Sequence, residues 1–315
     1  MNQRSNNFDF HSHMNIIGRK NIFLGISAVF IAAAVLAIAV LGFRQGIDFA
    51  GGTLWQFSIA KNTPSADSLE SFFSASGGKS VENLIGATVS YDEANNNFIA
   101  RLPTVSEPAH QELADALKEK YPSLEEASFQ SIGPSVSSGL RKNAITAIIF
   151  VILGISLYVA FAFRKVYQPV SSWVYGLITL LTLFHDVVIP AGLLALLGHY
   201  ARIEIDSNFV VALLVVMGFS VHDTIVVFDR IRENLLLDRG KSVFAELVNR
   251  SINQTMARSI NTSLTLIFVL LAIYFVGPAS LHYFVLTLLV GVTTGVYSSI
   301  FVASPLLVLW HNRKK

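Results

Sequence analysis

The sequence predicts an all-α membrane bundle of six helices, with one α+β domain of the ferredoxin-like kind inserted between the first and second helix. Three observations favour this fold class. The 315 residues are 52% hydrophobic and only 14% charged, whereas soluble domains average about 25% charged residues. Six segments are long and apolar enough to span a membrane, which takes about 20 residues. One long stretch after the first of these segments instead shows the short, alternating patterns of a soluble domain.

The six apolar segments define the predicted spans. They are residues 21–42, 144–163, 172–197, 208–228, 259–276 and 281–310. The first span follows Arg19 and Lys20, as the apolar part of a signal peptide does. It is nevertheless longer than the roughly 7 to 15 residues of such a part, and "LGFRQG" is a poor cleavage site. We therefore interpret the first span as an uncleaved anchor.

The loops between the predicted spans differ in charge. Lys and Arg gather on one side, at Arg19, Lys20, Arg164, Lys165, Arg230, Arg232, Arg239, Lys241, Arg250, Arg313, Lys314 and Lys315. Positively charged loops face the cytoplasm, so residues 1–20 and 312–315 are predicted to be cytoplasmic tails. On the same side, the loop at 229–257 is predicted to carry an amphipathic helix that lies in the membrane interface. Its apolar face consists of Val243, Phe244, Leu247, Val248 and Ile252.

Residues 43–139 are predicted to form the inserted, extracytoplasmic domain, and residues 140–311 hold spans two to six. Alternation predicts strands at 53–60, 82–91, 97–103 and 124–132, with a turn at 92–96, and the 3.6-residue period predicts helices at 65–76 and 106–121. The order β-α-β-β-α-β is that of the ferredoxin-like unit. A domain of this length can bury one modest core without disulfides.

Several function classes are disfavoured by what the sequence lacks. The chain contains no Cys, which excludes thiol catalysis, disulfides and thiolate metal sites. The "GGT" at 51–53 lacks the Lys of a phosphate-binding loop. A net charge of +2 reflects loops that mark the sides of the membrane, not nucleic-acid binding. We expect no metal, no cofactor, no nucleic-acid partner and no enzyme activity.

The dipeptide His-Asp occurs twice inside predicted spans, as His185 and Asp186 in the third span and as His222 and Asp223 in the fourth. A charge near the bilayer centre costs at least about 2.5 to 3.5 kcal/mol. A hydrogen bond between membrane helices returns only about 0.6 kcal/mol. We therefore predict that these pairs titrate during function. The alternative is that they are neutral polar residues that bind neighbouring helices.

Arg258, at the start of the fifth span, is a candidate partner for Asp223 because both are predicted at a similar depth. Protonation of Asp223 would break such a pair, which makes a conformational switch driven by one proton. The alternative is that Arg258 anchors its helix to lipid phosphate. The end of the fourth span carries a charged motif that is predicted to form helix-surface pairs. It consists of Asp229, Arg230, Arg232 and Glu233.

Four stretches of the sequence resemble the SecF family of protein-export subunits. They are "GIDFAGGT" after the first span, "LFHDVVIPAG" in the third, "GFSVHDTIVVFDRIREN" in the fourth and "ARSINTSLT" at the start of the fifth. The resemblance covers nearly the whole chain in order. The N-terminal 15 residues and the interior of the inserted domain carry no such motif. The chain departs from the family at Leu266, where a second Thr usually continues the fifth-span motif.

The resemblance implies a bundle of the resistance-nodulation-division type in the cytoplasmic membrane, paired with SecD and associated with SecYEG. Such a complex uses the proton motive force to help preproteins cross the membrane. The resemblance also implies that Asp223 is the proton-responsive carboxylate and Arg258 its basic partner, while Asp186 and His185 match the third-span motif. The signature at the hinge after the first span comprises Gly46, Asp48, Gly51 and Gly52.

Two other functions remain open from the sequence. One is a proton-coupled small-molecule exporter of the same superfamily, although such exporters usually have larger outer domains and a second outer domain in the same chain. The other is a structural assembly subunit, whose membrane charges only hold SecD in place. Replacing Asp223 or Arg258 separates this second alternative from a motor, because a scaffold should keep working with a neutral pair.

Overall fold

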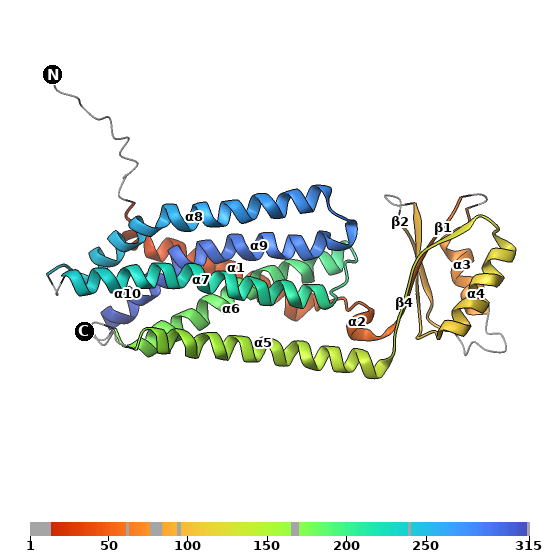
Figure 1. The fold of residues 1–315 in the computed structure, drawn as a ribbon, viewed down its shortest axis with the longest axis horizontal. Helices are drawn as coiled ribbons and strands as arrows, with labels where there is room; N and C mark the ends of the chain where they lie inside the picture. The colour runs from red at the N-terminus through yellow and green to blue at the C-terminus, as the bar shows by residue number, and fades with distance from the viewer. Residues whose placement is uncertain are drawn as a thin grey trace, which may run out of the picture. The chain divides into compact units, whose positions relative to one another are not determined.

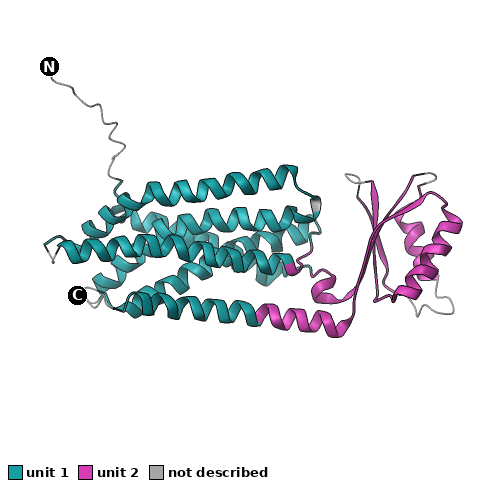
Figure 2. Cartoon of the chain, in the orientation of Figure 1, with its two compact units in different colours: residues 1–44, 146–203, 208–315 teal, residues 45–145, 204–207 magenta. Residues whose placement is uncertain are grey.

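The computed structural model describes residues 14–60, 63–75, 84–92, 96–164, 170–238 and 241–313. The chain divides into two compact units, coloured separately in Figure 2. Unit 1 comprises residues 1–44, 146–203 and 208–315, and unit 2 comprises residues 45–145 and 204–207. Each unit has its own buried core. The predicted N-terminal tail at residues 1–13 lies outside the described residues, as do residues 314–315 of the C-terminal tail.

Unit 1 is a bundle of helices that run side by side (Figure 1). Within the described residues, six helical segments are long and apolar enough to cross a membrane, which confirms the six predicted spans. They are α1 (Lys20–Leu41), α5 (Pro134–Ala162), α6 (Ser172–Tyr200), α7 (Ser207–Asp238), α8 (Phe244–Val276) and α9 (His282–Ser298) with α10 (Ser304–Arg313). About half of α6, of α7 and of the last span is buried, whereas α1, α5 and α8 are mostly exposed. The inner helices are therefore the ones that can hide polar side chains.

The last span is not a uniform α-helix. A π-helical stretch, Ser299–Ala303, separates α9 from α10, and Pro305 follows it directly. Proline has no backbone N–H and disturbs the turn that precedes it. Wider π turns are a common way for a helix to absorb such a disturbance. Pro190, in contrast, lies inside α6 and the helix continues through it.

The predicted boundaries are wrong at two places. Helix α5 begins at Pro134, so the polar "GPSVSSG" stretch is mostly helical, in keeping with proline's preference for the first turn. The segment at 229–257, predicted to be a loop with a separate amphipathic helix, instead belongs mostly to two long helices, because α7 extends to Asp238 and α8 begins at Phe244. Its apolar residues Phe244, Leu247, Val248 and Ile252 are buried in the bundle core, and only Val243 is exposed.

Two glycines allow neighbouring helices to approach closely. A Cβ atom at Gly192 of α6 would lie 2.4 Å from the Cβ of Ala34 on α1, and one at Gly291 of α9 would lie 2.2 Å from a methyl carbon of Val216 on α7. Neither distance is possible for real atoms, so any side chain at these positions must push two helices apart. Gly154 of α5, in contrast, has no atom within 4 Å of the corresponding point.

We expect Gly192→Leu to separate α1 from α6 and to lower the amount of folded chain. Overpacking of this kind costs about 1 to 3 kcal/mol or more. The measurement is the thermal midpoint of the detergent-solubilised protein, followed as the loss of the monodisperse peak in size-exclusion chromatography. Gly154→Leu is the matched control, since its added side chain meets open space. An equal loss of stability in both variants would contradict the close α1–α6 contact.

Unit 2 contains the predicted α+β domain. Its elements are α2 (Ile47–Ala50), β1 (Gly52–Ile59), α3 (Ala66–Ala75), β2 (Thr88–Asp92), β3 (Asn97–Leu102), α4 (Glu107–Lys120) and β4 (Leu124–Ile132). The strands form one antiparallel sheet in the order β2-β3-β1-β4, and α3 and α4 cover the same face (Figure 1). This order and topology confirm the ferredoxin-like arrangement.

The core of unit 2 lies between the sheet and the two helices. The alternate residues Trp55 and Phe57 of β1 are completely buried and contact Phe73 of α3. Strand β2 begins at Thr88, later than predicted, because residues 84–87 form a turn. Residues 82–83 of that expected strand and residues 93–95 of the expected hairpin turn lie outside the described part of the chain.

Candidate functional site

Asp186 is the centre of a buried polar cluster that joins three helices of the bundle. The residue is 0% exposed. Its Oδ1 atom lies 2.7 Å from Nδ1 of His185, also on α6, and its Oδ2 atom accepts a hydrogen bond of 2.7 Å from the Ser298 hydroxyl of α9. The Ser220 hydroxyl of α7 donates to the same oxygen. One carboxylate thus holds α6, α7 and α9 together through three donors.

The cluster continues along the seam between α7 and the last span. Thr224, one turn after Ser220, shares a hydrogen bond of 2.9 Å with Ser299, the first residue of the π-helical stretch. All of these hydroxyl groups are buried. Ser220, Thr224, Ser298 and Ser299 were not predicted, because isolated Ser and Thr residues in an apolar span have no pattern that distinguishes them.

Asp223 lies in a different setting from Asp186. It is only 1% exposed, and its Oδ2 atom accepts one hydrogen bond, of 3.2 Å, from the Ser263 hydroxyl of α8. The other oxygen lies 3.9 Å from Nδ1 of His222, which is too far for a hydrogen bond. The His222 side chain is 69% exposed. The two His-Asp dipeptides are therefore not equivalent: one is sealed in the core, and the other has its His outside the bundle and its Asp inside.

Arg258 lies on α8, the helix that also carries Ser263, but the Arg258 side chain does not reach Asp223. The Arg258 side chain is exposed, and no ion pair between Arg258 and Asp223 is found within the described residues. Arg258 precedes Ser263 by five residues, which corresponds to about 7.5 Å along the helix axis at 1.5 Å per residue. The structure thus brings α7 and α8 together at Asp223, with Arg258 about one and a half turns away.

The charged motif at the end of α7 forms the predicted surface pairs. Asp229 lies 2.7 Å from Arg232, and Arg230 lies 2.6 Å from Glu233, both three residues apart. Arg230 also donates to Gln254 of α8. This end of the bundle, called here the basic end, contains Arg230, Arg232 and Arg250.

A hydrogen-bonded contact that the sequence did not predict joins α7 and α8 at the basic end. The amide nitrogen of Asn234 donates to the Ser251 hydroxyl at 2.8 Å and to Gln254 at 2.9 Å. Asn234 is 5% exposed, so the contact is screened little by water. The motif at 229–233 is therefore part of a helix pair with defined partners and not of a loop.

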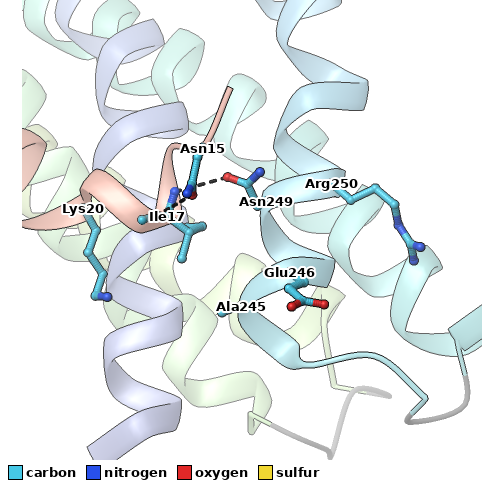
Figure 3. Close-up of a pocket in the computed structure, with 8 residues that line it drawn as sticks. Asn15, Ile17, Lys20, Ala245, Glu246, Asn249 and Arg250 are labelled. Carbon is cyan, nitrogen blue, oxygen red and sulfur yellow. Dashed lines mark hydrogen bonds between the residues drawn. The ribbon is translucent and has the colours of Figure 1, made fainter. Parts of the chain in front are cut away.

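A pocket of about 570 Å³ opens at the basic end (Figure 3). Asn249 holds the backbone before α1 beside it, because its side-chain oxygen accepts from the N–H of Ile16 at 2.9 Å and its nitrogen donates to the carbonyl of Met14 at 3.0 Å. The charged residues that line the pocket are Lys20, Arg250 and Glu246. None of the residues predicted to act in the membrane lies among those that line it, so the pocket is not part of the candidate site.

The glycines of the predicted signature form the turn that leads into β1. Gly51 and Gly52 have positive φ angles of 77° and 112°, a conformation that favours glycine. A Cβ atom at Gly52 would also lie 2.9 Å from the carbonyl oxygen of Leu102. The N–H of Gly46 donates to the carbonyl of Ile205 at 2.9 Å.

Asp48, the acidic residue of the signature, binds a backbone group far away in the sequence. Its Oδ2 atom accepts a hydrogen bond of 2.8 Å from the N–H of Ser207, the first residue of α7. The Asp48 carboxylate is thus a capping group for that helix. No cluster of three or more His, Asp or Glu side chains with metal-site spacing occurs within the residues that the structure describes.

Two family models match the sequence. The C-terminal model of the protein export membrane proteins SecD/SecF matches residues 112–313, and the SecD/SecF GG motif matches residues 36–57. The first match contains both His-Asp dipeptides and Arg258. The second contains all four signature residues, Gly46, Asp48, Gly51 and Gly52.

Relatives with similar sequences are named as SecF or SecDF protein translocase subunits. The protein translocase subunit SecF of Thermobaculum terrenum is 42% identical over 304 residues, which are 95% of each chain. The protein translocase subunit SecDF of Thermus thermophilus is 38% identical over 296 residues, which are 91% of this chain and 38% of that protein.

Two solved structures are similar to this chain. One is the crystal structure of SecDF from Thermus thermophilus, a translocon-associated membrane protein, with a TM-score of 0.79 and 34% identity. The other is SecDF in its super-membrane-facing form, with a TM-score of 0.67 and 35% identity. The matches cover 95% and 96% of this chain but 39% of each SecDF chain, so this chain spans about two fifths of their length.

Proposed function

The chain belongs to the SecD/SecF family of protein-export membrane proteins, and from this we propose that it is the SecF subunit of the Sec export machinery. Together with SecD, it uses the proton motive force to drive conformational cycles that promote preprotein movement through SecYEG. It is a non-enzymatic device and uses no cofactor. The single observation that carries the proposal is the setting of Asp223, a buried carboxylate in a predicted span that accepts a hydrogen bond from only one donor among the described residues.

The coupling step of the proposal is a change in the charge of Asp223. A carboxylate buried in apolar surroundings is costly to keep ionised unless donors or cations surround it. Within the part of the chain that the structure describes, the Ser263 hydroxyl is the one donor at hydrogen-bond distance from Asp223. Arg258 supplies the cation in another state of the cycle, after α8 has both shifted and rotated, because Arg258 and Ser263 lie about 140° apart around a helix with 3.6 residues per turn. Each charge that crosses the membrane contributes about 2.3 kcal/mol per 100 mV.

The proposed partner in the membrane is SecD. His222 and Arg258 are polar and exposed on the surface of the bundle, where lipid would be an unfavourable neighbour. Helices of SecD that cover this surface would provide polar partners for both side chains. Lipid contacts the rest of the exposed apolar surface of α1, α5 and α8. SecYEG and the preproteins are the further protein partners, and no nucleic acid takes part.

The proposed location is the cytoplasmic membrane, with both termini and the basic end on the cytoplasmic side. This orientation is supported by the arginines at the basic end, which the positive-inside rule places in the cytoplasm. Unit 2 is then the extracytoplasmic domain.

The alternative of a structural assembly subunit is supported by one observation, the buried cluster at Asp186, whose three donors hold helices together.

The test is translocation of a preprotein into proteoliposomes that contain SecYEG, SecA and the cognate SecD, with and without this chain. We expect an imposed proton gradient to increase the amount of protease-protected preprotein only when the chain is present. A protonophore should remove the increase and leave the ATP-driven part unchanged. Stimulation by the gradient that does not depend on the chain would contradict the proposal and favour the assembly subunit.

A further inference from the structure

We propose that the short segment at 204–207 is the joint through which movement of α7 reaches unit 2, and that Arg101, Glu204 and Asp48 are the positioning residues that hold it. This inference rests on the proposed function, since it assumes that α7 moves when Asp223 changes its charge. It adds the mechanical link between the membrane carboxylate and the inserted domain.

The first observation is that the segment belongs to unit 2. Residues 204–207 fall in unit 2, although α7 begins at Ser207 and residues from 208 onward belong to unit 1 (Figure 2). A parallel bridge between Gln45 and Ile205 ties the segment to the entry of unit 2. The helix therefore starts with its first residue inside the domain that it would have to move.

The second observation is an ion pair that joins the segment to the sheet. Nε of Arg101 lies 2.7 Å from Oε1 of Glu204, and the two side chains are 29% and 16% exposed. Arg101 belongs to β3, which pairs with β1 on one side and β2 on the other. An ion pair that is largely removed from water is screened less than one on the surface. Glu204 is thus held to an interior strand of the sheet.

The third observation is the cap on α7. Asp48 accepts a hydrogen bond of 2.8 Å from the N–H of Ser207. The first N–H groups of a helix have no partner within the helix, and a negative charge is favourable at this end. The same carboxylate lies in α2, three residues before the first of the two signature glycines, Gly51, so the cap links the start of α7 to the turn that leads into β1.

The path from this joint to Asp223 is a single helix. α7 runs without interruption from Ser207 to Asp238, and Asp223 lies 16 residues after Ser207, about 24 Å along the axis at 1.5 Å per residue. A continuous helix moves largely as one body, so a shift at Asp223 also moves Ser207. The cap and the ion pair then carry this movement to α2 and β3. α1 provides no such continuous path, because it ends before Gly42, whose φ is +67°. Helix α5 also continues from unit 2 into unit 1, but it carries neither Asp223 nor Ser263, so a change at Asp223 acts on α7 first.

The first experiment breaks and restores the ion pair in the full chain, in proteoliposomes with SecYEG, SecA and SecD. We expect Arg101→Gln and Glu204→Gln each to lose most of the gradient-dependent translocation, while ATP-driven translocation and assembly with SecD stay normal. The exchanged pair, Arg101→Glu with Glu204→Arg, should restore it. Full gradient stimulation in both single variants would overturn the proposal.

The second experiment replaces the ion pair with a reversible covalent bond. A Cβ atom at Gly46 would lie 3.7 Å from the Cβ of Glu204, within the range of about 3.5 to 4.5 Å that disulfides require. The φ of Gly46 is −74°, which any residue adopts, and the chain has no Cys of its own. With cysteine-free partner proteins, Gly46→Cys with Glu204→Cys should keep gradient stimulation when oxidised and lose most of it when reduced.

The controls separate this inference from the proposed function. Gly46→Cys alone should respond to neither oxidant nor reductant, and limited proteolysis of unit 2 should show the same resistance in all variants. Equal gradient stimulation of the double-cysteine variant in its oxidised and reduced forms would overturn the joint. If Asp223→Asn abolishes stimulation while the joint variants retain it, the joint is wrong and the proposed function stands. If Asp223→Asn also retains stimulation, the proposed coupling at Asp223 is wrong, and the inference about the joint is wrong as well.

Discussion

Asp223→Asn is expected to abolish the gradient-dependent part of preprotein translocation and to leave the ATP-driven part intact. Asn has nearly the same shape as Asp, and its side-chain oxygen can still accept the hydrogen bond from the Ser263 hydroxyl, 3.2 Å away. The contact between α7 and α8 is therefore retained. What the amide cannot do is change its charge. The variant therefore loses the change in charge at residue 223, the step that the gradient drives with about 2.3 kcal/mol per elementary charge per 100 mV.

The measurement is the rate of preprotein protection with and without an imposed gradient, normalised to the amount of chain that co-purifies with SecD. A pH gradient and an electrical potential should be imposed separately, because the charge of Asp223 responds to both. Asp186→Asn is the matched control, since it makes the same chemical change at the other buried carboxylate. Unchanged stimulation in Asp223→Asn would show that Asp223 is structural, and the proton path would then lie at Asp186 or in SecD.

The sequence predicted those features of the fold that depend on neighbouring residues. Span positions follow from uninterrupted apolar length, and the β-α-β-β-α-β order follows from periods of two and 3.6 residues. The same reasoning failed at 229–257. The period correctly identified Leu247, Val248 and Ile252 as one apolar face, but a period cannot say whether protein or lipid covers that face. The structure shows that the bundle core covers it.

The candidate site was predicted only as far as its charged residues. Both Asp residues stood out because a carboxylate in an apolar span is costly. Their partners did not, since they are brought together by folding: Ser298 is 112 residues from Asp186, and Ser263 is 40 residues from Asp223. The cap between Asp48 and Ser207 joins residues 159 positions apart. The predicted partner Arg258 is not paired with Asp223, because depth in the membrane does not fix which face of a helix a side chain occupies.

Asp186→Ala is expected to reduce the amount of folded chain strongly. The substitution leaves two buried donors, on His185 and Ser220, without the acceptor they have now, and each unsatisfied group costs about 1 to 3 kcal/mol. The Ser298 hydroxyl also loses its bond to Asp186, although it can still donate to the carbonyl of Gly295 at 3.1 Å. These donors come from α6, α7 and α9, so the three innermost segments lose their common contact. The measurement is the amount of chain extracted in monodisperse form and its thermal midpoint in detergent.

Asp186→Asn distinguishes a structural carboxylate from one that carries protons. Its oxygen still accepts a hydrogen bond, and its amide nitrogen can donate to a serine hydroxyl, because a hydroxyl is both donor and acceptor. The variant should therefore fold. We expect it to keep gradient stimulation, since the Asp186 side chain is completely buried and its three contacts, to His185, Ser220 and Ser298, hold helices together. If this variant folds but loses stimulation as Asp223→Asn does, the sealed cluster belongs to the proton path and both carboxylates must change charge in each cycle.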